Sequence, residues 1–148
     1  MEYPDQFIRG IINEQYIVNG VPDSALFKEF KINESKESNY AELSINWYDD
    51  ELAIIQMMSQ MDEAGERIYK VGVAILSRIE LDRLCIRNPV FRDNVKYERD
   101  PIMGINDYHG NILLKKDLLL PKPQKKIRDL IAANIAGSCY VDLLPANT

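Results

Sequence analysis

Tyr40–Trp47 reads YAELSINW, and its apolar residues alternate with polar ones along most of the stretch. A period of two predicts a half-buried strand with one face exposed to solvent. Farther along the chain, Arg67–Leu76 (RIYKVGVAIL) ends in an apolar run rich in Val and Ile, which is typical of a central strand covered on both faces. The sequence therefore predicts a β-sheet at the centre of the fold.

A helix is predicted between these two strands, over Asp49–Met61. Asp49 suits the N-cap position, and the acidic residues that follow it would place negative charge at the positive end of the helix dipole. An apolar stripe at helical spacing predicts the buried face, which consists of Leu52, Ile55, Met58 and Met61. The order strand, helix, strand resembles one crossover unit, although an antiparallel arrangement of the strands also fits the pattern.

The clearest helix lies near the C-terminus, between Pro123, which suits a first-turn position, and Gly137, which suits the C-terminal end. Its apolar face is predicted to comprise Ile127, Leu130, Ile131 and Ile135. A final strand is predicted over Cys139–Leu144, and a short capped helix over Pro22–Phe30. Polar stretches with Pro, Gly or Asn predict loops at Asn33–Asn39, Met61–Glu66, Asn88–Asn94 and Asp100–Asp107.

Length and composition fit one folded unit. With 148 residues, the chain has enough core for one domain and too little for two, so we predict a single domain over residues 1–148. The fold class that follows is α+β, with a small mixed β-sheet and two or three helices packed mainly on one face. A largely parallel α/β arrangement is the alternative, and it depends only on the strand-helix-strand stretch.

No segment of the sequence is typical of a membrane protein or of an exported one. The apolar runs fall far short of the roughly 20 residues that span a bilayer, and the N-terminal MEYPDQF lacks the pattern of a signal peptide. Cys85 and Cys139 lie far apart and form no metal-binding pair, so we expect two free thiols in a reducing compartment. These features predict a cytoplasmic protein without a membrane partner.

Charge is divided unevenly along the chain. Residues 1–66 contain 14 acidic and 4 basic side chains, whereas residues 67–148 contain 9 acidic and 14 basic ones. Several of the basic residues fall in the early turns of the predicted C-terminal helix, where the helix dipole disfavours positive charge. This misfit indicates a binding role, and the predicted partner-binding residues are Lys122, Lys125, Lys126 and Arg128. Neutralisation of the two halves within one folded unit is the alternative.

His109 is the only histidine, and it lies in the turn-like stretch Asn106–Asn111 (NDYHGN). Histidine is the side chain whose ordinary pKa lies closest to neutrality, so His109 is the candidate general acid or base, with Asp107 or another carboxylate as the group that orients it. A histidine that only hydrogen-bonds a loop is the alternative. Ser24 would complete the residue list of a nucleophilic triad, but it lacks the Gly-x-Ser-x-Gly elbow.

A metal site is a second hypothesis for chemistry. Asp49 and Asp50 follow a predicted strand and open a helix, where clustered carboxylates can hold Mg²⁺ or Ca²⁺, although such residues also serve as ordinary helix caps. Neither a phosphate-binding P-loop nor a dinucleotide fingerprint occurs, and one His with two distant Cys provides no zinc-binding set. We therefore expect no cofactor.

Four short pieces of the chain carry a resemblance. They are Arg9–Ile11 (RGI), Pro22–Phe27 (PDSALF), Glu42–Trp47 (ELSINW) and Asn106–Ile112 (NDYHGNI), followed by the basic C-terminal helix. In this order they resemble a group of small uncharacterised bacterial proteins found among mobile or phage-defence genes. Relatives in that group tend to have Asn-Pro-x-His where this chain has Asn-Asp-Tyr-His. The resemblance implies a bacterial accessory protein and supplies no mechanism.

The function predicted from these features is that of a small cytosolic accessory or binding protein. It would act through a protein partner or self-association, in a defence-type system if the resemblance extends to function. An enzyme is the less favoured class because no catalytic signature is present. Two alternatives stay open: a metal-assisted hydrolase or nuclease that uses His109 with nearby carboxylates, and a nucleic-acid-binding protein that uses Lys115–Arg128.

Overall fold

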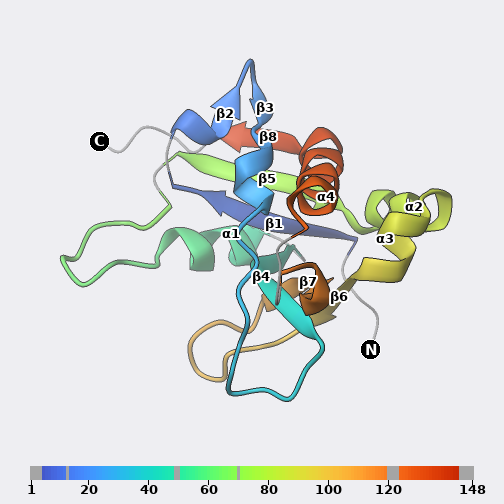
Figure 1. The fold of residues 1–148 in the computed structure, drawn as a ribbon. Coiled ribbons are helices and arrows are strands. Elements are labelled where there is room, and N and C mark those ends of the chain that lie inside the picture. Colours follow the sequence, from blue (N-terminus) through green and yellow to red (C-terminus); the bar gives the residue numbers. More distant parts are fainter. Residues whose placement is uncertain (1–4, 13, 49–50, 70, 120–123, 144–148) are drawn as a thin grey trace.

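The computed structural model describes residues 5–12, 14–48, 51–69, 71–119 and 124–143 (Figure 1). The strands are β1 (Gln6–Ile11), β2 (Ile17–Val18), β3 (Val21–Pro22), β4 (Tyr40–Tyr48), β5 (Gly72–Ser77), β6 (Val95–Arg99), β7 (His109–Lys115) and β8 (Tyr140–Leu143). The helices are α1 (Glu51–Met58), α2 (Arg78–Arg87), α3 (Pro89–Asn94) and α4 (Lys125–Gly137), with short 3-10 helices η1 (Glu14–Tyr16), η2 (Ser24–Phe27) and η3 (Lys116–Leu118).

One six-stranded sheet has the order β6-β7-β4-β1-β5-β8. Every pairing in it is antiparallel, so the prediction of a mixed sheet is wrong. The predicted α+β class is confirmed. Strands β4 and β5 run in the same direction, because each is antiparallel to β1, which lies between them. The stretch β4-α1-β5 is therefore a crossover, but the N-terminal strand separates its two strands.

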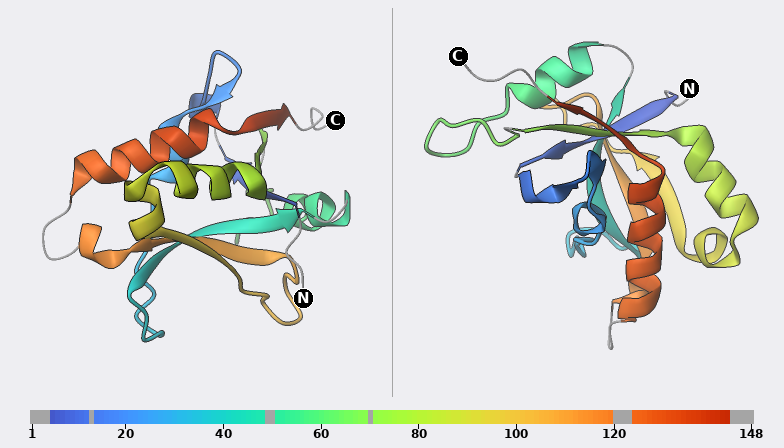
Figure 2. Two further views of the ribbon diagram at one scale, coloured as in Figure 1. Left: turned by 90° about the vertical axis from the view of Figure 1, so that its right-hand side faces the viewer. Right: turned by 90° about the horizontal axis from the view of Figure 1, so that it is seen from above.

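The helices lie mainly on one face of the sheet, as predicted. α2, α3 and α4 cover that face, and α1 lies on the opposite one (Figure 2). The larger core is buried under α2, α3 and α4, and Trp47 of β4 is fully buried within it. The rings of Phe7 and Tyr97 meet the Trp47 ring edge-on, with centroids 5.3 and 5.6 Å away. Trp47 thus joins β1, β4 and β6 across the sheet.

The buried face of α1 differs from the predicted stripe. Leu52, Ile55 and Met61 are more than half exposed, whereas Met57 is 3% exposed. Met57 and Ile54 pack on a small apolar cluster of β1 and β5. A helix of little more than two turns contacts few residues of the sheet. Ile54 and Met57, three positions apart, make this contact, and Leu52 and Ile55 of the predicted stripe remain exposed to solvent.

The predicted C-terminal helix and final strand are confirmed as α4 and β8. Ile131 and Ile135 are fully buried, but Leu130 is 46% exposed, and the small side chains of Ala132 and Ala136 complete the buried face. This face lets α4 lie close to η2. The short helix η2 lies within the segment Pro22–Phe30, for which the sequence predicts a short helix. None of the helices in the described ranges has the length and apolar character needed to cross a membrane.

The segment Asn88–Asn94, predicted as a loop, contains a helix instead. The side chain of Asn88 accepts a hydrogen bond from the backbone N–H of Val90 (3.0 Å), and Pro89 occupies the first turn of α3. Asn-Pro is a turn signal in many sequences, but here the same two residues cap and start a helix.

Candidate active site

Strands β1 and β4 pair only over Gln6–Ile8 of β1. Beyond these residues β1 continues against β5, and β4 continues against β7, so the two strands diverge. The guanidinium of Arg9 lies in the gap, where Nη1 donates to the carbonyl oxygen of Ser44 (2.6 Å) and Nε to that of Leu26 (2.7 Å). Two cavities, of about 170 and 360 Å³, lie beside this gap, and Ser44 and His109 line both.

The polar side chains at the cavities share one face of the sheet. Ile8 of β1, Asn46 of β4 and His109 of β7 are successive partners across three strands, and partnered residues point to the same face. Ser44 lies two residues before Asn46, so it also points to this face. The polar half of the YAELSINW alternation therefore faces the cavities, on the side of the sheet that carries α1.

Ser44 and His109 form the most specific contact of the site. Ser44 Oγ lies 2.6 Å from His109 Nε2, and His109 Nδ1 lies 2.8 Å from the backbone carbonyl oxygen of Asp100. A carbonyl oxygen can only accept, so Nδ1 carries a proton, and in the tautomer with its proton on Nδ1 the Nε2 atom accepts from the Ser44 hydroxyl. The result is a hydroxyl that donates to a base, with the base oriented by a third group.

The structure changes the roles predicted for two residues near His109. Asp107 is exposed, and it is not the group that orients His109, because the two ring nitrogens face Ser44 and the carbonyl of Asp100. The serine that contacts His109 is Ser44 rather than Ser24, which lies in η2. In the sequence, Ser44 has the pattern of an ordinary solvent-facing strand residue, and only the register of β4 against β7 brings it to the histidine.

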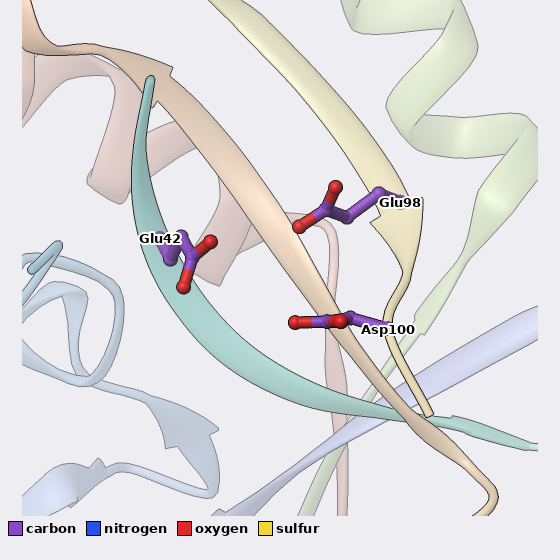
Figure 3. A group of neighbouring side chains, drawn as sticks. All are labelled: Glu42, Glu98 and Asp100. Atoms are coloured by element: carbon purple, nitrogen blue, oxygen red, sulfur yellow. The ribbon is translucent and has the colours of Figure 1, made fainter. Parts of the chain in front are cut away.

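A cluster of carboxylates lies beside the pair. One oxygen each of Glu42, Glu98 and Asp100 lies within 4.8 Å of the others, and the three side chains converge from β4 and from the end of β6 (Figure 3). Lys36 Nζ lies 2.8 Å from Glu42, 2.9 Å from Asp100 and 3.8 Å from Glu98. The hydrogen bond from Lys36 lowers the pKa of Asp100. The hydrogen bonds to Glu42 and Asp100 raise the pKa of Lys36. The cluster has the oxygen ligands that a divalent cation prefers, but an ammonium group already balances its charge.

Asn111 connects this cluster to the base. Its side chain is buried, and Nδ2 donates to Glu98 Oε1 (2.9 Å) and to Asp100 Oδ2 (3.2 Å). The Asp100 carboxylate is thus held by both Lys36 and Asn111, while the backbone oxygen of the same residue accepts from His109. The charged cluster therefore supports the position of the histidine ring.

The cysteines are not competing nucleophiles. Cys85 and Cys139 are free thiols, as predicted, and both are half-buried. Burial raises the pKa of Cys85, and it raises the pKa of Cys139 to about 12. Because the thiolate is the nucleophilic form, neither side chain is activated at neutral pH.

The predicted partner-binding residues lie apart from the Ser44–His109 pair, on α4. Lys125 and Lys126 are exposed at the beginning of the helix, whereas Arg128 donates to its neighbour Asp129 (3.3 Å). Asp129 also lies 3.7 Å from Lys28. Outside the described residues lie Asp49, Asp50, Lys122, Pro123 and the last residue of the predicted final strand, Leu144.

No protein-family model, curated protein or solved structure matches the chain. The chemistry of the site is therefore the guide to function, and the Ser44–His109 pair is its most specific feature.

Proposed function

We propose that this protein is a hydrolase of acyl compounds such as esters, in which Ser44 is the nucleophile and His109 is the general base. The proposal is carried by the 2.6 Å contact between Ser44 Oγ and His109 Nε2, with Nδ1 held by Asp100. A hydroxyl, a base and a group that orients the base recur in serine hydrolases of unrelated folds. Ser44 is exposed at the wall of both cavities, so a substrate can reach its hydroxyl.

The proposed reaction has two halves. Ser44 Oγ attacks the acyl carbon while its proton passes to His109 Nε2, and the alkoxide that leaves takes this proton and departs as the alcohol. A water molecule then gives a proton to Nε2, and its oxygen attacks the acyl carbon. The bond to Ser44 Oγ breaks, the acid is released, and the proton returns from Nε2 to the serine.

The sequence predicts a metal-assisted hydrolase as an alternative, in which a metal ion would activate water. The position of Lys36 favours the serine nucleophile over this alternative. Its ammonium lies between the carboxylates of Glu42 and Asp100, where it competes with a divalent cation for the same oxygens. The proposal keeps His109 as the base and replaces the activated water by the Ser44 hydroxyl.

Labelling with a fluorophosphonate tests the proposal. The Ser44 oxygen should attack phosphorus and displace fluoride, which adds one phosphonyl group to the protein at Ser44, as read by intact mass and peptide mapping. The Ser44→Ala variant should not be labelled, and His109→Gln should be labelled about 10²–10⁴-fold more slowly, because the serine loses its base.

Ser24→Ala is the matched control, since it removes a hydroxyl of the same kind away from His109, and it should be labelled at the wild-type rate. Heat-unfolded wild-type protein should not be labelled. Labelling of Ser44→Ala at the wild-type rate, or an unlabelled native protein, would contradict the proposal.

A docking role is a second candidate, and exposed charge on α4 favours it. Lys125 and Lys126, here called the basic pair, are exposed in the first turn, where their charge opposes the helix dipole. We propose that the basic pair binds an acidic surface of a protein partner or of a second copy of the chain. Residues 1–66 carry 14 acidic and 4 basic side chains, which makes a second copy of the chain a candidate partner, and this role would suit an accessory protein of a bacterial defence-type system.

Charge reversal of the basic pair tests this role. The double variant Lys125→Glu/Lys126→Glu should reduce the size of the wild-type assembly on a sizing column without lowering the melting temperature. Arg128 is left unchanged because Asp129 engages it. An unchanged size counts against docking, and tight duplex DNA binding that weakens steeply with salt would instead favour the nucleic-acid alternative.

A further inference from the structure

The Asn46 side chain has a buried donor that no group satisfies. Among the described residues, Asn46 Nδ2 is the buried side-chain polar atom without a hydrogen-bond partner, and Asn46 is 3% exposed. Leaving such a donor unpaired costs on the order of 1–3 kcal/mol in proteins, so a buried free donor at a cavity points to a ligand that accepts from it.

The orientation of the Asn46 amide follows from its neighbours. The backbone N–H of Tyr108 donates to Asn106 Oδ1 (3.0 Å), which fixes the Asn106 amide with Nδ2 on its other side. Asn106 Nδ2 then donates to Asn46 Oδ1 (2.9 Å). A flipped Asn46 amide would set two NH₂ groups against each other, so Nδ2 is the atom left free.

The residue that carries the free donor lines the same cavity as the proposed nucleophile. Asn46, Ser44 and His109 all line the cavity of about 170 Å³. Asn46 and His109 are direct partners of β4 and β7, so their Cβ atoms are about 5 Å apart. A carbonyl group attacked by Ser44 would therefore lie near the side chain of Asn46.

Large apolar side chains also line this cavity. They are Met57, Tyr69, Ile102 and Ile105, with the polar Gln60 among them, and Ile105 is 71% exposed. The volume is close to the roughly 150 Å³ of a cavity that holds a benzene molecule, so an acyl group of a few carbon atoms fits it.

We infer that Asn46 is a catalytic residue, whose Nδ2 donates to the carbonyl oxygen of the substrate as that oxygen becomes negative, and that the substrate is an ester of a short apolar acid. The acyl chain packs on Met57, Ile102 and Ile105. This inference rests on the proposed function, because it assigns the oxyanion and the acyl group of the same reaction.

Hydrolysis of 4-nitrophenyl esters by the purified full chain tests the inference. Asn46→Asp removes the donor and keeps the oxygen that accepts from Asn106, so kcat for the butyrate should fall about 10²–10³-fold with little change in KM. Asn46→Ala should show the same loss in kcat, and it replaces Asn46→Asp in the test if that variant does not fold. Asn134→Asp, on α4, is the matched control and should hydrolyse the butyrate at the wild-type rate.

The acyl class is tested on the wild-type protein alone. The kcat/KM for 4-nitrophenyl butyrate should exceed that for the laurate and for a negatively charged succinyl ester by at least about tenfold. Preference for either of the latter overturns the assigned substrate class.

The two proposals fail in different ways. If wild-type protein forms an acyl-Ser44 species and Asn46→Asp forms it as fast, the role of Asn46 is overturned while the proposed hydrolase stands. If wild-type protein forms no acyl-Ser44 species with any ester, the proposed function itself is overturned.

Discussion

A Gly110→Ala variant should be less stable than the wild-type protein by about 3 kcal/mol, because there is no room for a side chain at this position. A Cβ at Gly110 would lie closer than 3.0 Å to the carbonyl oxygen of Glu98 and to two atoms of the Trp47 ring. The indole Nε1 donates to that same carbonyl (3.1 Å). The methyl group would therefore overlap a buried hydrogen bond that neither partner can easily leave.

Neither partner can move without breaking other contacts. Arg99 of β6 is the partner of Gly110, so the Glu98 carbonyl belongs to a paired strand, and the Trp47 ring is held between Phe7 and Tyr97. Overpacking of this kind costs about 1–3 kcal/mol, and a weakened buried hydrogen bond adds about 1 kcal/mol. Because Gly110 follows His109 directly, the shift should also slow the labelling of Ser44.

The measurement is urea unfolding followed by the fluorescence of Trp47, the only tryptophan. A loss of this size should lower the melting temperature by roughly 10 °C. Gly137→Ala is the matched control: a Cβ there meets nothing within 4 Å, and alanine favours a helix, so its stability should equal or exceed that of the wild type. Equal stability of Gly110→Ala and wild type would refute the packing of Trp47 over this glycine.

A Lys36→Met variant should lose on the order of 1 kcal/mol of stability at pH 7, since partly exposed ion pairs contribute up to about 1 kcal/mol each. The change removes the cation that separates Glu42, Glu98 and Asp100, and leaves three carboxylates within 4.8 Å of one another. It also leaves Asn111 as the remaining side-chain donor to the carboxylate of Asp100, the residue whose backbone carbonyl orients His109.

The sign of the pH dependence follows from the two shifted groups. Asp100 has a lowered pKa in the folded state, so its contribution is present above its unfolded pKa of about 3.9 and is lost as the pH falls through the lower folded value. Lys36 has a raised pKa, so its contribution is present below about 10.4 and is lost as the pH rises through the folded value. The contributions of Asp100 and Lys36 to the free energy of unfolding are therefore both fully present between roughly pH 5 and 9.

The stability deficit of Lys36→Met should therefore be full at pH 7 and shrink below about pH 4, because the wild-type protein loses the contribution of its Lys36–Asp100 bond as Asp100 takes up a proton. Urea unfolding of both proteins at pH 7 and at pH 3 measures the difference. Lys126→Met, at an exposed lysine of α4, is the control and should change stability by only a few tenths of a kcal/mol at either pH. A deficit that stays the same at both pH values would contradict the electrostatic coupling.

Local signals in the sequence were sufficient for several elements. The alternation of YAELSINW predicts β4, and the capped, apolar segments predict α4 and η2, where the Asp23 carboxylate accepts from the backbone N–H of Ala25 (3.1 Å). Each of these depends on neighbours a few residues apart. The sequence leaves β1, which lies between β4 and β5 in the sheet, without a prediction.

The proposed site was only partly visible in this way. His109 stands out because it is the only histidine, but Ser44 and Asn46 are two polar residues on the side of a strand that the alternation predicts to face solvent. What distinguishes them is the register of β4 against β7, which sets Asn46 opposite His109, and the divergence of β1 from β4. A shift of one residue in this register would turn both side chains to the other face of the sheet.

The amino-acid sequence by itself determined the α+β class, the polar and apolar faces of β4 and the amphipathic α4, because periodicity and capping act over a few neighbouring residues, and it made the single histidine, His109, a candidate. The tertiary structure alone decided the antiparallel strand order, the contact of Ser44 with His109, the free amide of Asn46 and the neutralisation of the carboxylates by Lys36. These features join residues far apart in the chain, and pairing between distant strands depends on the packing of the whole sheet rather than on local preference.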